Sequence, residues 1–413
     1  MVTGAITEGA LAGLRVLDLS RVLAGPWAGQ LLADLGADVV KVERPAAGDD
    51  TRAWGPPWVK DEDGDETGES AYYLSANRNK RSVTIDIESA EGRALVTQMA
   101  TRADIVIENF KVGGLARYGL DYATLSGLNP RLIYCSITGF GQTGPYAARP
   151  GYDFLIQAMG GLMSLTGRPD GAAGAGPVKV GVALTDVMTG LYATIAIMAA
   201  LAHRTRTGVG QQVDLALLDV QVATLANQAS NYLVGGVAPG RMGNAHPNIV
   251  PYQDFPSADG YLIIAVGNDL QFGKLCQTLG QPEWHADQRF ASNPQRVKHR
   301  AALVPLIASV TVTRSTATWI ALMEQAGVPC GPINTLDQVF ADPQVQARGM
   351  RIDMAHPLAG SVPLVANPIH LSASPVRYER APPTLGQHTD EVLAHWLELD
   401  AAAIADCRAK KII

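Results

Sequence analysis

Asp186 stands at a point where a carboxylate could act as a nucleophile. It ends the segment PVKVGVALTD, and the apolar residues after it predict a helix from about 187 to 203. Aspartate often caps a helix N-terminus, which also favours the ionised form of the acid. An ionised carboxylate can attack an activated acyl group. Position alone therefore leaves a capping role and a catalytic role open for Asp186.

A second group of candidates lies in the segment GYDFLIQAMGG. Asp153, which follows Tyr152, would either satisfy the backbone donors of a turn or contribute a carboxylate to a site. Gly160 and Gly161 close the segment, and because glycine has no Cβ they let the backbone approach a ligand. His246 lies in the loop-like stretch GNAHPNIVPY, where it is either an ordinary loop residue or part of a site.

A third candidate is the run NRNKR at 77–81, which contains Arg78. It lies between the aromatic pair Tyr72-Tyr73 and the strand-like segment SVTIDI. A run of charges can simply form a solvated face. At the entrance of a strand, however, three cations could hold an anion such as a phosphate, so both interpretations stay open.

The composition excludes several classes of protein. The 413 residues carry 33 basic and 39 acidic side chains, a net charge of −6, which gives no basic footprint for nucleic acid or an anionic membrane. A hydrophobic fraction of 47% with 17% charged residues argues against disorder. The cysteines form no CxxC pair and the histidines no HxH or HExxH motif. These spacings argue against a disulfide scaffold and a metal enzyme.

We expect a cytoplasmic protein. Residues 1–10 lack the basic start and long apolar core of a secretory signal. The longest apolar run, VMTGLYATIAIMAALA at 187–202, is shorter than the roughly 20 residues that a membrane span needs. The run therefore predicts a buried helix of a large core.

The elements that must position these residues alternate between strand and helix. In the first 140 residues, strand-like and helix-like segments follow one another at 14–20, 27–36, 38–43, 90–102, 104–108 and 131–137. This alternation predicts an open α/β sheet of parallel strands, with a crevice at their carboxyl ends. The turn after the first strand, SRVLAGPWAG, lacks GxGxxG, so NAD or FAD binding is not favoured.

The middle of the chain reads as a separate, smaller domain. Residues 140–182 are rich in Gly and Pro, and a long irregular stretch of this kind is usually functional or wraps another chain. A strand is predicted at 261–266, followed by mostly helical sequence. We expect a large domain at 1–205, a linker at 206–224, a small domain at 225–325, and at 326–413 a linker with the C-terminal part of the large domain.

Several motifs together resemble the class III CoA-transferase family, the CaiB/BaiF type. They run from about Leu11 to the C-terminus and include LRVLDLSRVLAGPWAG, NRNKRS, ENF, NPRLIYCSITGFGQTGP, GYDFLIQAMGG, ALTD, GVPCGPINT and LGQHTDEVL. The resemblance implies an interlocked homodimer of ring-like subunits. It also implies a Rossmann-like large domain built from both chain ends and a small domain inserted between them.

The resemblance also assigns roles to residues. The family nucleophile falls on Asp186, and coenzyme A is a co-substrate without any permanently bound cofactor or metal. The implied CoA contacts are Val22, Leu23, Ala24, Arg44, Ile85, Asn109, Phe110, Arg117 and Phe140. The chain departs from the family pattern at Leu23, where the formyl-CoA branch has Gln, and at Glu88 and Thr138, where the family has Lys. GNAHPNIVPY also replaces a glycine-rich loop.

The implied reaction moves CoA from an acyl-CoA donor, with succinyl-CoA expected, to a carboxylic acid, expected to be a dicarboxylate. It would pass through an aspartyl anhydride and an aspartyl-CoA thioester on Asp186. Backbone N–H groups near Gly160, Gly161 and 246–248 are candidate oxyanion donors. A far carboxylate on the substrate would favour a bidentate arginine, for which Arg52 and Arg78 are the candidates.

Two other functions are compatible with the same family. An α-methylacyl-CoA racemase needs two bases, one of them the His of a GHD motif, where this chain has Tyr152. Tyrosine, with a reference pKa of about 10, is a poor base at neutral pH. A non-catalytic CoA-binding protein is the other alternative. It would not need the helix-opening carboxylate of Asp186.

Overall fold

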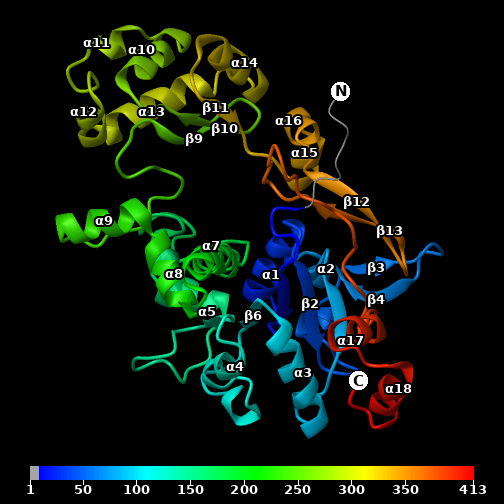
Figure 1. Ribbon diagram of the computed structural model, residues 1–413. Coiled ribbons are helices and arrows are strands. Elements are labelled where there is room, and N and C mark those ends of the chain that lie inside the picture. The colour runs from blue at the N-terminus through cyan, green and yellow to red at the C-terminus, as the bar shows by residue number, and fades with distance from the viewer. Residues whose placement is uncertain (1–8) are drawn as a thin grey trace. The chain divides into compact units, whose positions relative to one another are not determined.

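The computed structural model describes residues 9–413, which fall into two compact units (Figure 1). The described part of the first unit comprises residues 9–162, Lys179–Gly236 and Gln346–Ile413, and the second unit comprises Met163–Val178 and Val237–Val345. These bounds differ from the expected ones. Residues 206–224 were expected to be a linker, but they contribute strand β8 (Gln212–Ala216) and helix α8 (Leu217–Thr224) to the first unit.

A six-stranded parallel sheet forms the centre of the first unit. Its strand order is β5-β2-β1-β6-β7-β8, and every neighbouring pair is parallel. The strands other than β8 are β1 (Arg15–Asp18), β2 (Asp38–Glu43), β5 (Arg81–Thr84), β6 (Ile105–Glu108) and β7 (Ile133–Thr138). The four predicted strands are thus confirmed as β1, β2, β6 and β7. The order reverses between β1 and β6, and open α/β sheets bind ligands outside the strand ends at such a point.

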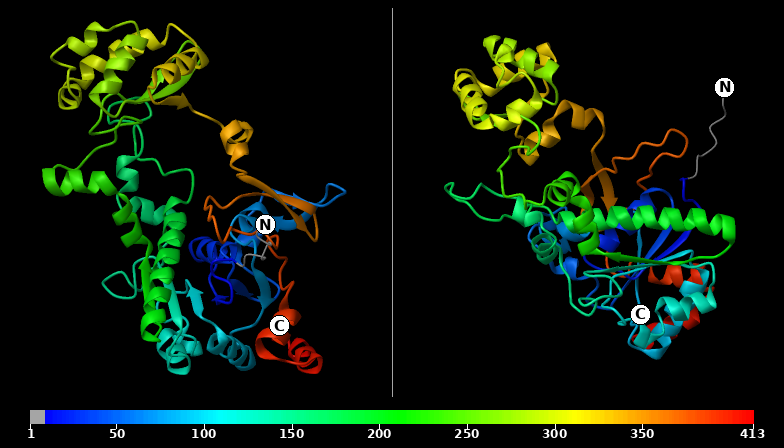
Figure 2. Two further views of the ribbon diagram at one scale, coloured as in Figure 1. Left: turned by 45° about the horizontal axis from the view of Figure 1, so that its top comes forward. Right: turned by 90° about the vertical axis from the view of Figure 1, so that its left-hand side faces the viewer.

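Helices cover both faces of this sheet, as the alternating side chains of each strand require. Val16 of β1 faces a core formed with α1 (Ala24–Asp34), α5 (Asp153–Met159), α7 (Leu184–Thr207) and α8. Leu17 faces the opposite core, formed with α3 (Ala90–Arg102), α4 (Tyr122–Leu128), α17 (Thr389–Leu397) and α18 (Ala401–Ala409). Figure 2 shows α7 along one face of the sheet and the two C-terminal helices on the other side.

Helix α7 is the predicted apolar helix, extended to 24 residues. By length and composition α7 could cross a membrane, and so could the bent pair α13 (Arg300–Thr311) and α14 (Thr316–Ala326). The buried side of α7 is one stripe that includes Thr189, Ala193 and Ile197, and it packs against α1 and the sheet. Gly190 lies where a Cβ would come within 2.8 Å of the Ala24 carbonyl oxygen. One side of α7 is thus part of the core, but the expectation of a fully buried helix is wrong, because Ile195 and Met198 on its other side are exposed.

The first unit has further short elements outside the central sheet and its main covering helices. They are η1 (Asp50–Ala53), β3 (Trp58–Lys60), β4 (Glu66–Ser70), α2 (Ala71–Leu74), η2 (Ala116–Tyr118), α9 (Ala226–Gly235), β12 (Arg351–His356) and β13 (Gly360–Val365). Strands β3 and β4 form one antiparallel pair, and β12 and β13 form another. The short helices α6 (Leu162–Leu165) and α16 (Pro343–Ala347) fall on the unit boundaries.

The second unit has its own core on a three-stranded antiparallel sheet. The order is β11 (Cys330–Pro332), β10 (Tyr261–Ala265) and β9 (Tyr252–Pro256), so the predicted strand at 261–266 is confirmed as β10. Helices α10 (Asp269–Thr278), α11 (Glu283–Ala286), α12 (Asn293–Lys298), α13, α14 and α15 (Leu336–Ala341) complete this unit. Trp319 is buried in the core, and its indole N–H donates to the Thr311 carbonyl oxygen at 2.7 Å.

Candidate active site

A cavity of about 530 Å³ opens at the point where the strand order reverses. Its walls come from the loops that follow β1, β6 and β7, together with the first turn of α7. The cavity brings together eight of the residues expected from the sequence: Val22, Leu23, Ala24, Asn109, Phe110, Arg117, Tyr152 and Asp186. The expected nucleophile and most of the expected CoA contacts therefore share one cavity.

The loop after β1 has an unusual backbone conformation at the cavity wall. Val22 has a φ of 72°, a left-handed conformation that is costly for a β-branched residue. Its N–H donates to the carboxylate of Asp49 at 3.2 Å. The Asn109 side chain accepts from the Arg21 N–H at 2.9 Å and donates to the Arg21 carbonyl oxygen at 2.6 Å. Helix α1 then begins without a side-chain cap, which suits an anionic ligand.

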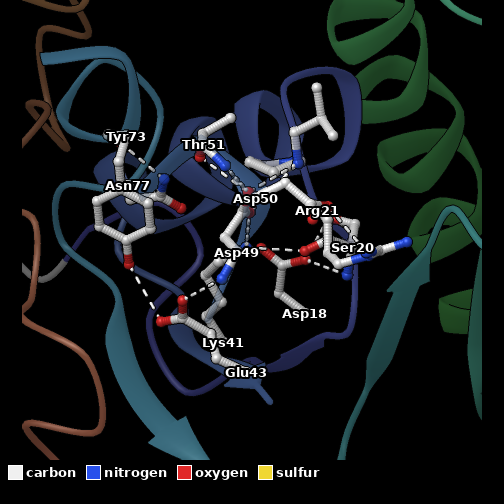
Figure 3. Close-up of polar contacts among 12 residues, drawn as sticks. Asp18, Ser20, Arg21, Lys41, Glu43, Asp49, Asp50, Thr51, Tyr73 and Asn77 are labelled. Atoms are coloured by element: carbon white, nitrogen blue, oxygen red, sulfur yellow. Dashed lines mark hydrogen bonds and ion pairs between the residues drawn. The ribbon is translucent and has the colours of Figure 1, made fainter. Parts of the chain in front are cut away.

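Buried ion pairs support this loop from below (Figure 3). Lys41, fully buried, lies 2.8 Å from Asp49 and donates to the Ser20 carbonyl oxygen at 2.7 Å. Burial favours the neutral acid, but the charge of Lys41 outweighs it and lowers the pKa of Asp49 to about 2. Asp18 accepts from Lys80 at 3.0 Å, and burial lowers the pKa of Lys80 to about 8 despite that pairing. The buried pair Lys41–Asp49 therefore supports the conformation of the loop that contains Val22.

Asp186 is not the cap of α7. The N-cap is Ala183, and the carboxylate that caps the first turn belongs to Asp153. One oxygen of Asp153 accepts from the Thr185 N–H at 2.8 Å and from the Asp186 N–H at 3.2 Å. Burial, and then the charge of Asp153, raise the pKa of Asp186 to about 7. The capping alternative for Asp186 is therefore wrong, and its carboxylate is left available at the cavity.

Tyr72 does not line the cavity but interacts electrostatically with Asp186 and Asp153, which the sequence did not reveal. Burial and the charges of Asp186 and Asp153 raise the pKa of Tyr72 to about 12, so its hydroxyl is neutral near the carboxylate pair. Trp54 contacts its ring edge-on, with 5.2 Å between centroids. The pair Tyr72-Tyr73 was visible in the sequence. Which of the two faces the site depends, however, on where the short helix α2 begins.

The remaining CoA candidates lie beside the main cavity. Arg44 and Ile85 line a second cavity of about 190 Å³, which shares Arg21, Phe110 and Arg117 with the first. Arg44 is exposed, and Ile85 is buried in its wall. Phe140 lines neither cavity, being buried against Tyr146 and Arg149, whose own side chains lie toward the solvent.

Three further candidates do not line the cavity that contains Asp186. Gly160 packs against α8, because an added Cβ would lie 2.4 Å from the Gln221 side chain. Gly161 follows it with a φ of 90°. His246 belongs to the second unit, where its ring contacts Tyr252 and partial burial lowers its pKa.

Arg52, one candidate for a far carboxylate, is already bound to protein carboxylates. It lies 2.8 Å from Glu43 and 3.0 Å from Glu69, and it also donates to the Pro383 carbonyl oxygen at 3.0 Å. Its guanidinium stacks 3.7 Å above the Tyr73 ring. Arg52 therefore has a structural role in this protein and does not line the cavity.

Arg78, the other candidate, is bound in the same way. Its Nε donates to Asp34 at 2.9 Å and its Nη1 donates to the Val365 carbonyl oxygen at 2.8 Å. Only 4% of Arg78 is exposed, and it does not line the cavity. The run at 77–81 is thus neither a solvated face nor an open anion site, because Lys80 and Arg81 also form ion pairs.

Metal binding has no candidate in the part of the chain that the structure describes. Residues 9–413 contain no group of three or more His, Cys, Asp or Glu side chains that could hold a metal ion. The cavity instead combines two carboxylates, Asp186 and the Arg21-paired Asp50, with an uncapped helix start and several cations. This combination suits an anionic ligand that carries an activated acyl group.

Comparison with known proteins agrees with this description. The profile of CoA-transferase family III matches residues 11–389. The succinate–glutarate CoA-transferase of Agrobacterium fabrum is 54% identical over 95% of this chain and 97% of its own length. The succinyl-CoA:glutarate CoA-transferase of Mus musculus is 46% identical over 95% of this chain and 88% of its own length. The crystal structure of a CAIB/BAIF family protein from Brucella suis is 53% identical and covers 94% of this chain and all of its own, with a TM-score of 0.82.

The chain therefore belongs to CoA-transferase family III, the CaiB/BaiF family. It is a CoA-transferase, and CoA thioesters are its co-substrates.

Proposed function

We propose that this enzyme transfers CoA from succinyl-CoA to a dicarboxylic acid, and that glutarate is the first acceptor to test. The observation that carries the proposal is the Asp186 carboxylate, which lies at the wall of a cavity lined by the expected CoA contacts. The names of the two glutarate-using relatives support the choice of donor and acceptor.

The proposed reaction runs through four acyl transfers on Asp186. The carboxylate attacks the succinyl thioester carbon, which forms a mixed anhydride and releases the CoA thiolate. The thiolate attacks the aspartyl carbon, which gives aspartyl-CoA thioester and releases succinate. The acceptor carboxylate attacks that thioester, forming a new anhydride and freeing the thiolate again. The thiolate then takes the acceptor acyl group and restores the Asp186 carboxylate.

Two features of the site support this chemistry. The pKa of Asp186 is about 7, so a large fraction is ionised at neutral pH while its basicity exceeds that of an ordinary aspartate. Tyr72 interacts electrostatically with Asp186, and its neutral hydroxyl is the nearby group proposed to stabilise negative charge that develops there. Any water in the site would waste the thioester, so bound substrate must exclude it.

Arg149 takes the place of Arg52 and Arg78 as the residue for a far carboxylate. It lines the same cavity as Asp186. Its guanidinium lies 5.2 Å from the Phe140 ring centroid and 4.5 Å from that of Tyr146, and it forms no ion pair with an acidic residue within 9–413. An arginine without an acidic partner beside the nucleophile matches a substrate that carries a second carboxylate.

The Arg149 assignment is tested by comparing two donors. We expect Arg149→Ala to lower kcat/KM for succinyl-CoA at least about 30-fold more than for butyryl-CoA, because only succinyl-CoA loses a charge-assisted pair. Arg117→Ala is the matched control, since Arg117 lines the same cavity and is expected to bind a CoA phosphate. It should affect both donors equally. Equal losses for both donors in Arg149→Ala would refute the assignment.

The covalent route is tested by trapping. Incubation with succinyl-CoA and hydroxylamine should convert Asp186 to a hydroxamate, because anhydrides and thioesters are both activated acyl groups. Peptide mapping by mass spectrometry locates the label, and a panel of acids identifies the acceptor. A label on another residue, or no label during turnover, would contradict the route.

We also propose that the enzyme is a cytoplasmic, interlocked homodimer without a permanently bound cofactor. Large apolar side chains of the first unit are exposed on three helices: Phe154, Leu155 and Met159 of α5; Leu191, Tyr192, Ile195 and Met198 of α7; and Tyr232, Leu233 and Val234 of α9. Ile195 is 62% and Leu233 is 79% exposed. Apolar surface of this extent supports a partner subunit.

A further inference from the structure

The Asp153 carboxylate accepts a hydrogen bond from the backbone N–H of Asp186, and no bond joins it to the Asp186 side chain. The first turn of a helix has N–H groups with no partner inside the helix, and the N-cap Ala183 supplies no side-chain acceptor. One oxygen of Asp153 fills this gap by accepting from Thr185 at 2.8 Å and from Asp186 at 3.2 Å. The orientation of the Asp186 side chain therefore depends on a residue of another helix, α5.

Asp153 is itself held in place. It is the first residue of α5, it is 9% exposed, and its second oxygen accepts from Gln157 Nε2 at 2.6 Å. Gln157 is fully buried, and its side-chain oxygen accepts from the Val180 N–H at 3.0 Å. The carboxylate thus accepts hydrogen bonds at both oxygens, which is the bonding pattern of an ionised acid.

The start of α7 is also tied to a third helix. The Thr185 hydroxyl donates to the side-chain oxygen of Gln221 on α8 at 2.6 Å, and Gln221 is 2% exposed. Helices α5, α7 and α8 are thereby joined at one buried polar cluster. Asp186 is the next residue along the chain, and its carboxylate is the one that lines the cavity.

We propose that Asp153 is a positioning residue of this transferase, whose carboxylate fixes the first turn of α7 and places a negative charge beside the nucleophile Asp186. This inference rests on the proposed covalent function. The charge has a consequence for the reaction, because acylation makes Asp186 neutral. A neighbouring anion destabilises the free carboxylate but not the anhydride or the thioester, so it favours formation of the acyl-enzyme.

Asp153 of α5 and Tyr72 of α2 interact electrostatically with Asp186, and the hydroxyl of Tyr72 stays neutral because its pKa is about 12. The other charged residues that line the same cavity are Asp50, Arg21, Lys111, Arg117 and Arg149. Burial and the charge of Asp153 together raise the pKa of Asp186 to about 7. Removing the Asp153 charge therefore lowers the pKa of the nucleophile and leaves the effect of burial in place.

The test compares neutral and charged replacements of Asp153. Asp153→Asn and Asp153→Ser keep an acceptor for the α7 N–H groups but remove the charge. We expect the acid limb of the kcat/KM–pH profile to move from near pH 7 to at least about one unit lower in both variants. With the limb at 7, activity at pH 6 is about one tenth of the plateau, and with the limb at 6 it is about half. Asp153→Glu, which keeps the charge, should leave the limb in place.

A second measurement follows the acyl-enzyme directly. At a fixed ratio of succinyl-CoA to succinate, the neutral variants should hold a several-fold smaller equilibrium fraction of aspartyl-CoA by intact-protein mass spectrometry. Gln157→Leu is the structural control, because it loosens α5 without changing any charge, and it should not move the acid limb.

The outcomes separate this inference from the proposed function. If wild-type enzyme forms no adduct on Asp186, the covalent function is wrong. If wild-type enzyme forms the adduct, but a folded Asp153→Asn or Asp153→Ser keeps the wild-type acid limb, then the role of Asp153 is refuted and the covalent function stands.

Discussion

At the scale of single residues, the raised pKa of Asp186 implies a cost in stability. A carboxylate that titrates near 7 in the folded protein and near 3.8 in the unfolded chain is held in an unfavourable state at neutral pH. Below about pH 4 the acid is protonated in both states, and the cost disappears. It develops as the pH rises toward 7 and is complete above that. The shift corresponds to about 4 kcal/mol if it is realised in full.

Asp186→Asn should therefore abolish turnover and stabilise the fold. We expect its free energy of unfolding at pH 8 to exceed that of wild type by about 2–4 kcal/mol, and this gain to vanish at pH 4. Chemical denaturation at the two pH values measures both terms. Asp63→Asn, on an exposed turn, is the matched control and should change neither. A variant that is less stable than wild type at pH 8 would show that the Asp186 carboxylate is not under strain.

Whether a single residue lies at the cavity could be predicted from local motifs but not from distant partners. Asp186, singled out by the family motif, and six of the CoA candidates, from the motifs after β1 and β6, line one cavity, while their roles stay predictions. Arg52 and Arg78 were poor candidates for ligands because a buried arginine needs protein partners. Those partners include Pro383 and Val365, which lie about 300 residues away in the chain. No spacing pattern reveals such pairs.

At the scale of elements, the loop between β1 and α1 depends on buried charges beneath it. Lys41 of β2 neutralises Asp49, and Asp49 in turn accepts the N–H of Val22 in its strained conformation. Removing one member of a buried pair leaves the other charge uncompensated.

Lys41→Met tests whether the loop between β1 and α1 depends on the Lys41–Asp49 pair. We expect a loss of about 3–5 kcal/mol in the free energy of unfolding, together with a raised KM for the acyl-CoA donor, because the loop that lines the cavity loses its support. Lys410→Met removes an exposed pair with Asp406 and should cost at most about 0.5 kcal/mol, with KM unchanged. An unchanged KM in a destabilised Lys41→Met would mean that the loop keeps its shape without the ion pair.

The elements themselves were predictable where burial is complete. Strands β1, β2, β6 and β7 are rich in apolar residues because both of their faces are covered, although β2 also contains the buried Lys41. Strand β8 was missed and assigned to a linker. It is an edge strand that pairs with β7 alone, and its exposed positions are Gln212 and Asp214. An edge strand does not need the apolar pattern that identifies a central one.

At the scale of the whole molecule, the subunit association is the main expectation still to be tested. If two chains interlock, they cannot separate without opening a ring. Dissociation should then coincide with loss of secondary structure, and the dimer should persist at nanomolar concentration. Analytical ultracentrifugation with fluorescence detection, compared with circular dichroism on the same dilution series, measures both. A folded monomer on dilution would contradict the interlocked arrangement.

The first unit is assembled from three separate stretches of the chain, and this affects how it can be made on a ribosome. Trp396 and Val392 fill the core beside α3, and the backbone N–H groups of His388 and Asp86 donate to the carbonyl oxygens of Ser82 and Ile412. The last strand of the sheet ends at Ala216, yet the core on the α3 and α4 face lacks α17 and α18 until the last residues leave the exit tunnel. The second unit is therefore translated before the first unit is complete. Until then, that part of the core is accessible to chaperones. A nonsense mutation that removes α17 and α18 would leave every residue that lines the Asp186 cavity encoded, and we expect the truncated chain not to fold.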